Sequence, residues 1–104
     1  MWVSETNSGA TTSGSALTRR LTIVNRRGLH ARAAAKLVTL VERFGAAVDV
    51  FKDGQEVSAR SIMGLMMLGA GQGSTIEVRA DGWDAKEAMD AVVGLIEAGF
   101  DEHD

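Results

Sequence analysis

The chain has 104 residues, enough for one domain with one hydrophobic core but too few for separate cofactor and substrate domains. Its 11 Lys and Arg against 14 Asp and Glu give a net charge of −3, which disfavours nucleic acid as a partner. With no cysteine, the chain has no disulfides, thiolate metal sites or cysteine nucleophiles. Its apolar runs are too short to span a bilayer and residues 1–16 do not resemble a signal peptide, so we expect a cytoplasmic protein that binds no membrane.

The first half of the chain predicts a tail, a strand and a helix. Residues 1–16 are rich in Ser, Thr and Gly, a composition expected to form a flexible tail. Residues 17–24 alternate between apolar and polar side chains and predict the first strand. Apolar residues at spacings of three and four then predict an amphipathic helix over residues 31–44, closed by Gly45.

The sequence GLHAR, Gly28 to Arg32, lies between this strand and this helix. It places His30 at a helix start, where free backbone N–H groups and the helix dipole favour an anion such as phosphate. A neutral imidazole is abundant near pH 7 and can attack a phosphoryl group. The Arg32 guanidinium can hydrogen-bond phosphoryl oxygens in a fork geometry. The five residues therefore predict a phosphohistidine site, with Gly28 as the turn residue that lets His30 face outward.

The middle of the chain predicts a hairpin and a short helix. Residues 46–51 and 56–59 read as two strands, and the Asp-Gly pair at 53–54 is the signal of a tight turn between them. Ser61 is expected to cap a helix over residues 62–68.

The short helix is apolar on nearly all sides, more than one buried face can absorb. Leu65 and Leu68 are expected to fill the core. Ile62, Met63 and Met66 are expected to form an exposed docking surface, because adaptable methionines suit a surface that receives several proteins in turn.

The last part predicts a fourth strand over residues 75–80 and a final helix. Asp84 and Glu87 have the spacing of a capping box, and the helix is expected to end near Gly99, before an acidic tail at 100–104. One domain over residues 17–99 follows, with the order βαββαβα. The predicted fold class is α+β: a two-layer, open-faced sandwich with a four-stranded antiparallel sheet and three helices on one face.

Two segments, GLHARAAAKLV at 28–38 and SARSIMGLMMLG at 58–69, resemble the HPr family, the histidine-containing phosphocarriers of the phosphoenolpyruvate-dependent phosphotransferase system. The resemblance covers residues 17–98. It implies that His30 is phosphorylated on Nδ1 by enzyme I and that Arg32 supports the phosphoryl group. It also implies that Ser61 matches the serine that an HPr kinase/phosphorylase modifies in many bacteria.

One position departs from the family's pattern. Many members that serve sugar transport have proline directly after the motif arginine, whereas this chain has Ala33. Proline would fix the first helical turn, while alanine only permits it. Such sequences often belong to the nitrogen-related branch, so sugar transport and nitrogen regulation both stay open.

We therefore expect a monomeric phosphocarrier that takes a phosphoryl group from enzyme I on His30 and passes it to an EIIA-type acceptor. It would be a carrier with a phosphohistidine intermediate rather than an independent enzyme, and it would need no metal or cofactor because the donor holds the activated phosphate. One alternative is a regulatory protein-binding module acting through Ser61, Ile62, Met63 and Met66. Another is a small α+β domain that binds a small molecule.

Overall fold

Four strands form one antiparallel sheet in the order β2-β5-β3-β4. They are β2 (Ala16–Thr22), β3 (Ala47–Lys52), β4 (Gln55–Ser58) and β5 (Thr75–Asp81). The computed structural model describes residues 16–102. Of the tail predicted for residues 1–16, residues 1–15 lie outside the described residues, and Ala16 belongs to β2. Asp53 and Gly54, both at positive φ, form the tight turn between β3 and β4, as the Asp-Gly pair predicts.

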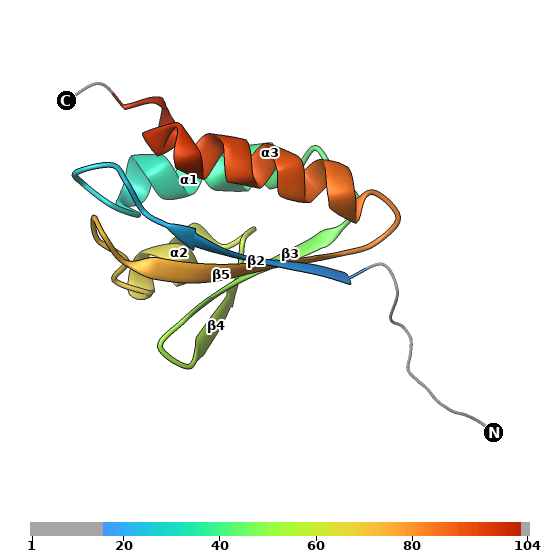
Figure 1. Cartoon of the computed structure of the whole chain (residues 1–104), viewed down its shortest axis with the longest axis horizontal. Helices are drawn as coiled ribbons and strands as arrows, with labels where there is room; N and C mark the ends of the chain where they lie inside the picture. Colours follow the sequence, from blue (N-terminus) through green and yellow to red (C-terminus); the bar gives the residue numbers. More distant parts are fainter. Residues whose placement is uncertain (1–15, 103–104) are drawn as a thin grey trace.

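Two long helices, α1 (Ala31–Val41) and α3 (Ala85–Glu97), lie side by side over one face of this sheet (Figure 1). The short helix α2 (Ile62–Met67) packs beside α1 and next to β4. A single 3₁₀ turn, η1 (Gly99–Asp101), follows α3. The predicted α+β fold, with a four-stranded antiparallel open sheet and three helices, is confirmed.

The core lies between the sheet and the helices. Alternate residues of the central strands point into it, while their neighbours face outward and carry charge, such as Asp49 and Arg79. The Arg79 guanidinium stacks on the Phe51 ring on the outer face, 5.2 Å from the ring centroid. The largest fully buried side chains are Phe100, Ile23, Leu37, Leu65, Ile76, Met89, Ile96, Val41, Val48, Val50, Val78 and Val92.

Helix α1 ends at Val41, three residues before the end that the apolar stripe predicts. The chain continues in a tighter turn, in which the Arg43 and Phe44 N–H groups donate to carbonyls three residues earlier. The Arg60 guanidinium donates to the carbonyl oxygens of Val41 and Phe44 at 3.1 and 2.8 Å. Arg60 therefore supplies hydrogen-bond donors to carbonyls at the C-terminal end of α1, where a helix leaves its last carbonyls without N–H partners of its own.

The capping box predicted at Asp84 is wrong. The Asp84 side chain makes no capping hydrogen bond to α3 and is only 6% exposed. Its two carboxylate oxygens accept the N–H groups of Gly45 and Ala46 at 2.9 and 2.8 Å. Through these two hydrogen bonds, Asp84 links the start of α3 to the turn after α1.

The domain continues past the boundary predicted at residue 99. Phe100, assigned to the acidic tail, is fully buried in the core. Its φ of 57° and the φ of 58° at Asp101 are left-handed values, and they turn the chain back after α3. The Lys36 ammonium donates to the Phe100 carbonyl at 2.6 Å. Residues 99–102 therefore belong to the packed fold and lie against α1.

Candidate functional site

His30 is the N-cap residue of α1. Its backbone is extended, with φ −75° and ψ 178°, and its Nδ1 accepts the Arg32 N–H at 3.3 Å. The first bond of the helical ladder belongs to Ala34, whose N–H donates to the His30 carbonyl. The N–H groups of residues 31–33 precede that ladder, so Nδ1 faces the positive end of the helix dipole.

Gly28 determines how closely the chain before α1 packs against the loop at Ala70. Its φ is 66°, and a Cβ built on it would lie 2.4 Å from the Ala70 carbonyl oxygen. The next residue, Leu29, donates its N–H to that same oxygen at 2.9 Å and is buried. Only glycine lets the two loops come this close, and the contact fixes the chain immediately before His30.

Arg32 and Ala33 occupy the first turn in different ways. Arg32 is exposed, and none of the carboxylates within residues 16–102 pairs with its guanidinium. Ala33 is fully buried under the turn. The helix therefore begins at Ala31 without a proline at residue 33, and the Arg32 guanidinium is free to meet a ligand.

Sequence reasoning missed Glu102, which contacts the Nε2 edge of the His30 ring, and Asn25, which holds Glu102. His30 Nε2 is hydrogen-bonded to Oε2 of Glu102, and Glu102 Oε1 accepts from Asn25 Nδ2 at 2.9 Å. Asn25 is buried and donates through the same nitrogen to the Gly28 carbonyl at 2.9 Å. No local signal identifies Glu102, since it lies 72 residues from His30 in a segment that reads as an acidic tail.

These contacts lower the pKa of the Glu102 carboxyl. The hydrogen bond from Asn25 and then that with His30 hold the pKa of the Glu102 carboxyl below its ordinary value. Glu102 is therefore an anion at neutral pH. Its side chain is 10% exposed and that of His30 is 16% exposed, so the pair is largely shielded from water.

Three cations line one side of a shallow groove between α1 and α3: Arg32 and Lys36 in the first half of α1, and Arg43 in the turn that follows it. Such a row of cations attracts a phosphoryl group or an acidic partner surface.

The structure places Ser61 and the predicted docking residues around α2. Ser61 Oγ accepts the Gly64 N–H at 2.9 Å, so the predicted N-cap is confirmed. Leu65 and Leu68 are buried, as predicted, while Ile62, Met63 and Met66 are exposed. Sequence reasoning left out Met67, which is 74% exposed and exceeds even Met63, at 67%.

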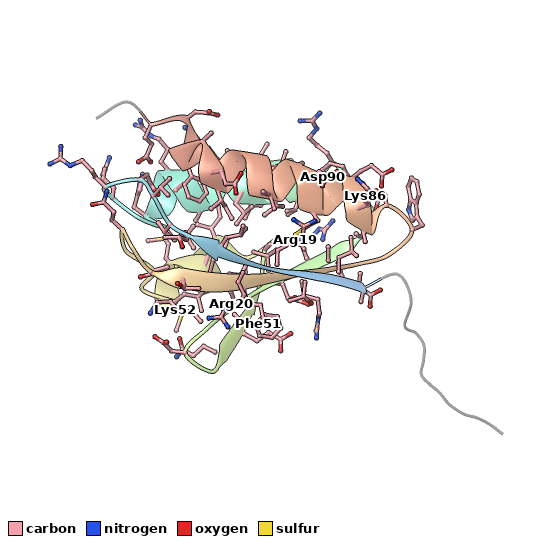
Figure 2. The ribbon with its side chains drawn as sticks, viewed as in Figure 1. Arg19, Arg20, Phe51, Lys52, Lys86 and Asp90 are labelled. Atoms are coloured by element: carbon pink, nitrogen blue, oxygen red, sulfur yellow. The ribbon has the colours of Figure 1, made fainter. Side chains whose placement is uncertain are left out.

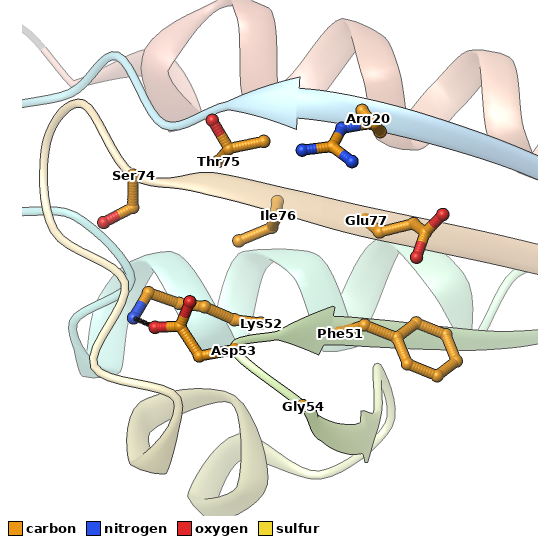
Figure 3. A pocket seen from close by; sticks show the side chains of 9 residues that line it. All are labelled: Arg20, Phe51, Lys52, Asp53, Gly54, Ser74, Thr75, Ile76 and Glu77. Carbon is orange, nitrogen blue, oxygen red and sulfur yellow. Dashed lines mark hydrogen bonds and ion pairs between the residues drawn. The ribbon is translucent and has the colours of Figure 1, made fainter.

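Arg20, Phe51 and Lys52 lie on the face of the sheet opposite α1 and α3 (Figure 2), and they line a second hollow there. Figure 3 shows Arg20, Phe51 and Glu77 around it, with Lys52 and Asp53 paired at 2.8 Å. None of the residues of the His30 site lines it. Over residues 16–102, no three His, Cys, Asp or Glu side chains gather as a metal site would require. None of the helices described there is long and apolar enough to cross a bilayer.

Comparisons with known proteins identify the family of this chain. The family model described as "PTS HPr component phosphorylation site" matches residues 17–98. Phosphocarrier protein HPr of Cupriavidus necator is 51% identical over 83% of this chain and 97% of its own length. Phosphocarrier protein NPr of Shewanella violacea is 45% identical over 83% of this chain and 94% of its own length.

Solved structures give the same result. HPr from Thermoanaerobacter tengcongensis superposes with a TM-score of 0.80 at 42% identity, covering 84% of this chain and 98% of that one. HPr from Bacillus anthracis superposes with a TM-score of 0.76 at 38% identity, covering 80% and 99%. The match to the family model covers most of the described fold and includes His30 and Arg32, and the chain therefore belongs to the HPr family of phosphotransferase-system phosphocarriers.

Proposed function

We propose that His30 accepts a phosphoryl group on Nδ1 from phosphorylated enzyme I and passes it to an EIIA-type acceptor. The observation that carries this proposal is the place of the His30 ring, which caps α1 with Nδ1 turned toward the first free N–H groups of the helix. A phosphoryl group on Nδ1 would lie where those N–H groups and the helix dipole stabilise negative charge.

The transfer itself needs little chemistry from the carrier. The Nδ1 lone pair attacks phosphorus, the N–P bond forms, and the bond from phosphorus to the donor atom breaks with its electron pair staying on the donor. The Arg32 N–H now bound to Nδ1 is then free to donate to a phosphoryl oxygen. The reverse steps deliver the group to the acceptor, so positioning and electrostatics carry the reaction.

Arg32 is the second component of the proposed site. Its guanidinium is exposed beside the helix start and can reach outward to the phosphoryl oxygens, which it binds in a fork. Its charge, with those of Lys36 and Arg43, also favours approach of an acidic partner.

The docking surface for these partners is proposed to be Ile62, Met63, Met66 and Met67. Four exposed apolar side chains on a helix of six residues leave much apolar area in water. Flexible thioethers adapt to partners of different shape, which suits a carrier that meets a donor and an acceptor in turn.

Ser61 is proposed as a regulatory phosphorylation site for an HPr kinase/phosphorylase. It is partly exposed and directly precedes Ile62 and Met63. A phosphate there would place negative charge at the edge of the apolar docking surface and weaken docking of an acidic or apolar partner. Ser61→Ala should remove acid-stable label from ATP, while Ser58→Ala should keep it.

A regulatory binding module acting through the same α2 surface is the second candidate, because that surface is exposed whether or not His30 is phosphorylated. Relatives named HPr and NPr both match the chain, so the proposal covers sugar transport and nitrogen regulation alike. A monomer in the cytoplasm is proposed for either role.

Incubation with enzyme I and labelled phosphoenolpyruvate tests the carrier. We expect acid-labile label on the wild-type chain and none on His30→Ala. The control is His103→Ala, which changes the chain's other histidine and should label as the wild type does. A wild-type chain that takes up no label from a competent donor contradicts the carrier function and favours the binding module.

A further inference from the structure

The outer face of the sheet holds a hollow that the proposed function does not use. Its volume is about 520 Å³, which is within the range of small-molecule sites. Its lining comes from three neighbouring strands, β2, β5 and β3, and from the turn after β3 (Figure 3). Neither His30 nor Arg32 belongs to the lining. A molecule bound in this hollow would therefore not cover the phosphoryl site.

One row of side chains crosses the three strands at the hollow. Arg20 of β2 lies opposite Glu77 of β5, and Glu77 in turn lies opposite Phe51 of β3. All three are on the outer face, because the next residue along each strand points into the core or away from this face. A cation, an anion and an aromatic ring therefore lie next to one another across the sheet.

The two charges of this row do not pair with each other. In Figure 3 the Arg20 guanidinium extends toward Thr75, whereas the Glu77 carboxylate extends in the opposite direction along β5. Within residues 16–102, neither charged group has an ion pair or a side-chain hydrogen bond. Oppositely charged side chains at directly opposed positions commonly attract each other. Here both charges remain available to a ligand.

Neighbouring charges on the same face are already paired. The Arg79 guanidinium lies 3.7 Å from a carboxylate oxygen of Asp49 and 3.6 Å from one of Glu56. It also stacks on the Phe51 ring, which forms one wall of the hollow. These residues therefore do not compete for Arg20 or Glu77.

The charges in the lining favour a ligand with both signs of charge. Lys52 and Asp53 neutralise each other at 2.8 Å, which leaves Arg20 and Glu77 as one free cation and one free anion. A simple anion would be attracted by Arg20 but repelled by Glu77, and a simple cation would meet the reverse arrangement. A molecule that carries a carboxylate and an ammonium group satisfies both.

We propose that this hollow binds a small zwitterion of the α-amino acid class. The Arg20 guanidinium would donate two parallel hydrogen bonds to the ligand carboxylate, and the Thr75 hydroxyl beside it would donate a third. The Glu77 carboxylate would accept the ligand ammonium. Because Arg20 and Glu77 start from opposed positions, about 4.5–5.5 Å apart between Cα atoms, both can reach two charged groups attached to one carbon. The ligand side chain would lie against Phe51.

This inference is independent of the chemistry of His30. The hollow lies on the face of the sheet opposite α1, whose first turn forms the phosphoryl site (Figure 2). The chain would then bind a small metabolite on one face of the sheet and exchange a phosphoryl group on the other.

Titration of the ¹⁵N-labelled chain with each of the proteinogenic L-amino acids, followed by NMR, tests the proposal. At least one should shift the amide signals of Arg20, Thr75 and Glu77 and saturate with a dissociation constant on the order of 1 mM, since two charged contacts in an open hollow give modest affinity. The N-acetyl and C-terminal amide derivatives of that amino acid each lack one charge. Each should bind at least about tenfold more weakly.

Variants of the chain test the same two contacts from the protein side. Arg20→Gln and Glu77→Gln each remove one charge and keep a polar side chain, and each should weaken binding at least about tenfold. The matched control is Arg19→Gln. Arg19 lies opposite the buried Val78 and is on the α3 side of β2 (Figure 2), so its replacement should leave the affinity at the wild-type value.

The absence of saturable shifts with every amino acid, up to about 20 mM or some twenty times the expected dissociation constant, overturns the inference. Equal binding of the N-acetyl derivative also overturns it, because the hollow would then select an anion alone. Wild-type affinity in Arg20→Gln or Glu77→Gln would be equally decisive against it. Phosphoryl uptake from enzyme I is measured separately on the same chains. A failure there refutes the function proposed for His30 and leaves the amino-acid titration to decide on the hollow.

Discussion

Replacing Asp84 by alanine should destabilise the fold through the turn after α1. The Asp84 carboxylate is 6% exposed and accepts two backbone N–H groups, from Gly45 and Ala46. Ala46 is fully buried, so its N–H would lose its partner without gaining water, which costs about 1–3 kcal/mol. Gly45 is exposed, and its N–H can bond to water instead. Losing the Gly45 hydrogen bond should therefore cost only the net contribution of one hydrogen bond, about 1 kcal/mol.

The sum predicts that Asp84→Ala lowers the free energy of unfolding by about 2–4 kcal/mol. For a domain of this size, that corresponds to a fall in Tm of at least about 8 °C. Urea denaturation measures the free energy, and amide hydrogen exchange at Gly45 and Ala46 locates the effect. The stability of Asp84→Asn should lie between those of wild type and Asp84→Ala, because the amide of Asn retains one oxygen that can accept a backbone N–H.

Glu87→Ala is the control. If Asp84 and Glu87 formed a capping box, Glu87→Ala would lower the free energy of unfolding as much as Asp84→Ala does. Because Glu87 is exposed, we expect its replacement to change the free energy of unfolding by less than about 0.5 kcal/mol. A loss below about 1 kcal/mol for Asp84→Ala, with unchanged exchange at Gly45 and Ala46, would refute the reasoning.

Three further outcomes are expected. Gly28→Ala should lose at least about 1–2 kcal/mol from the left-handed φ alone and more from the clash with the Ala70 carbonyl, whereas Gly71→Ala, with open space around its Cβ, should melt like wild type in thermal denaturation. Arg32→Lys should slow phosphoryl uptake from enzyme I and Arg32→Ala should slow it more, because an ammonium cannot form the fork; equal rates in rapid-quench experiments would remove Arg32 from the site. Glu102 should add a pH dependence to stability. Its pKa is lowered in the folded state by Asn25, then His30 and, more weakly, Arg27, so its contribution is present above the ordinary value of 4.5 and is lost as pH falls through the folded-state pKa. Urea denaturation at pH 7 and pH 3 should therefore show a difference between wild type and Glu102→Gln that shrinks at the lower pH.

The local parts of the fold could be predicted from the sequence. The Asp-Gly pair at 53–54 identifies the β3–β4 turn because its backbone conformation depends on those two residues alone. Ser61 caps α2 through an atom three residues away. In both cases the interaction and the pattern span the same few residues.

Features that depend on distant residues could not be predicted in this way. The apolar stripe of α1 continues to Phe44, but Arg60, which takes up the last carbonyls, comes from the loop before α2. Asp84 has the right residue type and spacing for a cap, yet two N–H groups of the turn after α1 lie closer to its carboxylate. A pattern along the chain carries no information on such competition.

The same distinction applies to the site. The Nδ1 side of His30 is made by Gly28 to Arg32, so the motif predicts it. The Nε2 side is made by Glu102, whose contact depends on the docking of α3 and the burial of Phe100. Sequence reasoning could find half of the site because only half of it is local.

The contact between residues 30 and 102 also makes the site a reporter of complete folding. It joins the helix that follows the first strand of the sheet to the last described turn, so the paired ring exists only where the chain between residues 30 and 102 has brought these two parts together. A chain whose α3 has not yet docked contains the whole GLHAR segment but lacks the paired imidazole. Nascent or partly unfolded molecules would thus carry the motif without its Nε2 partner.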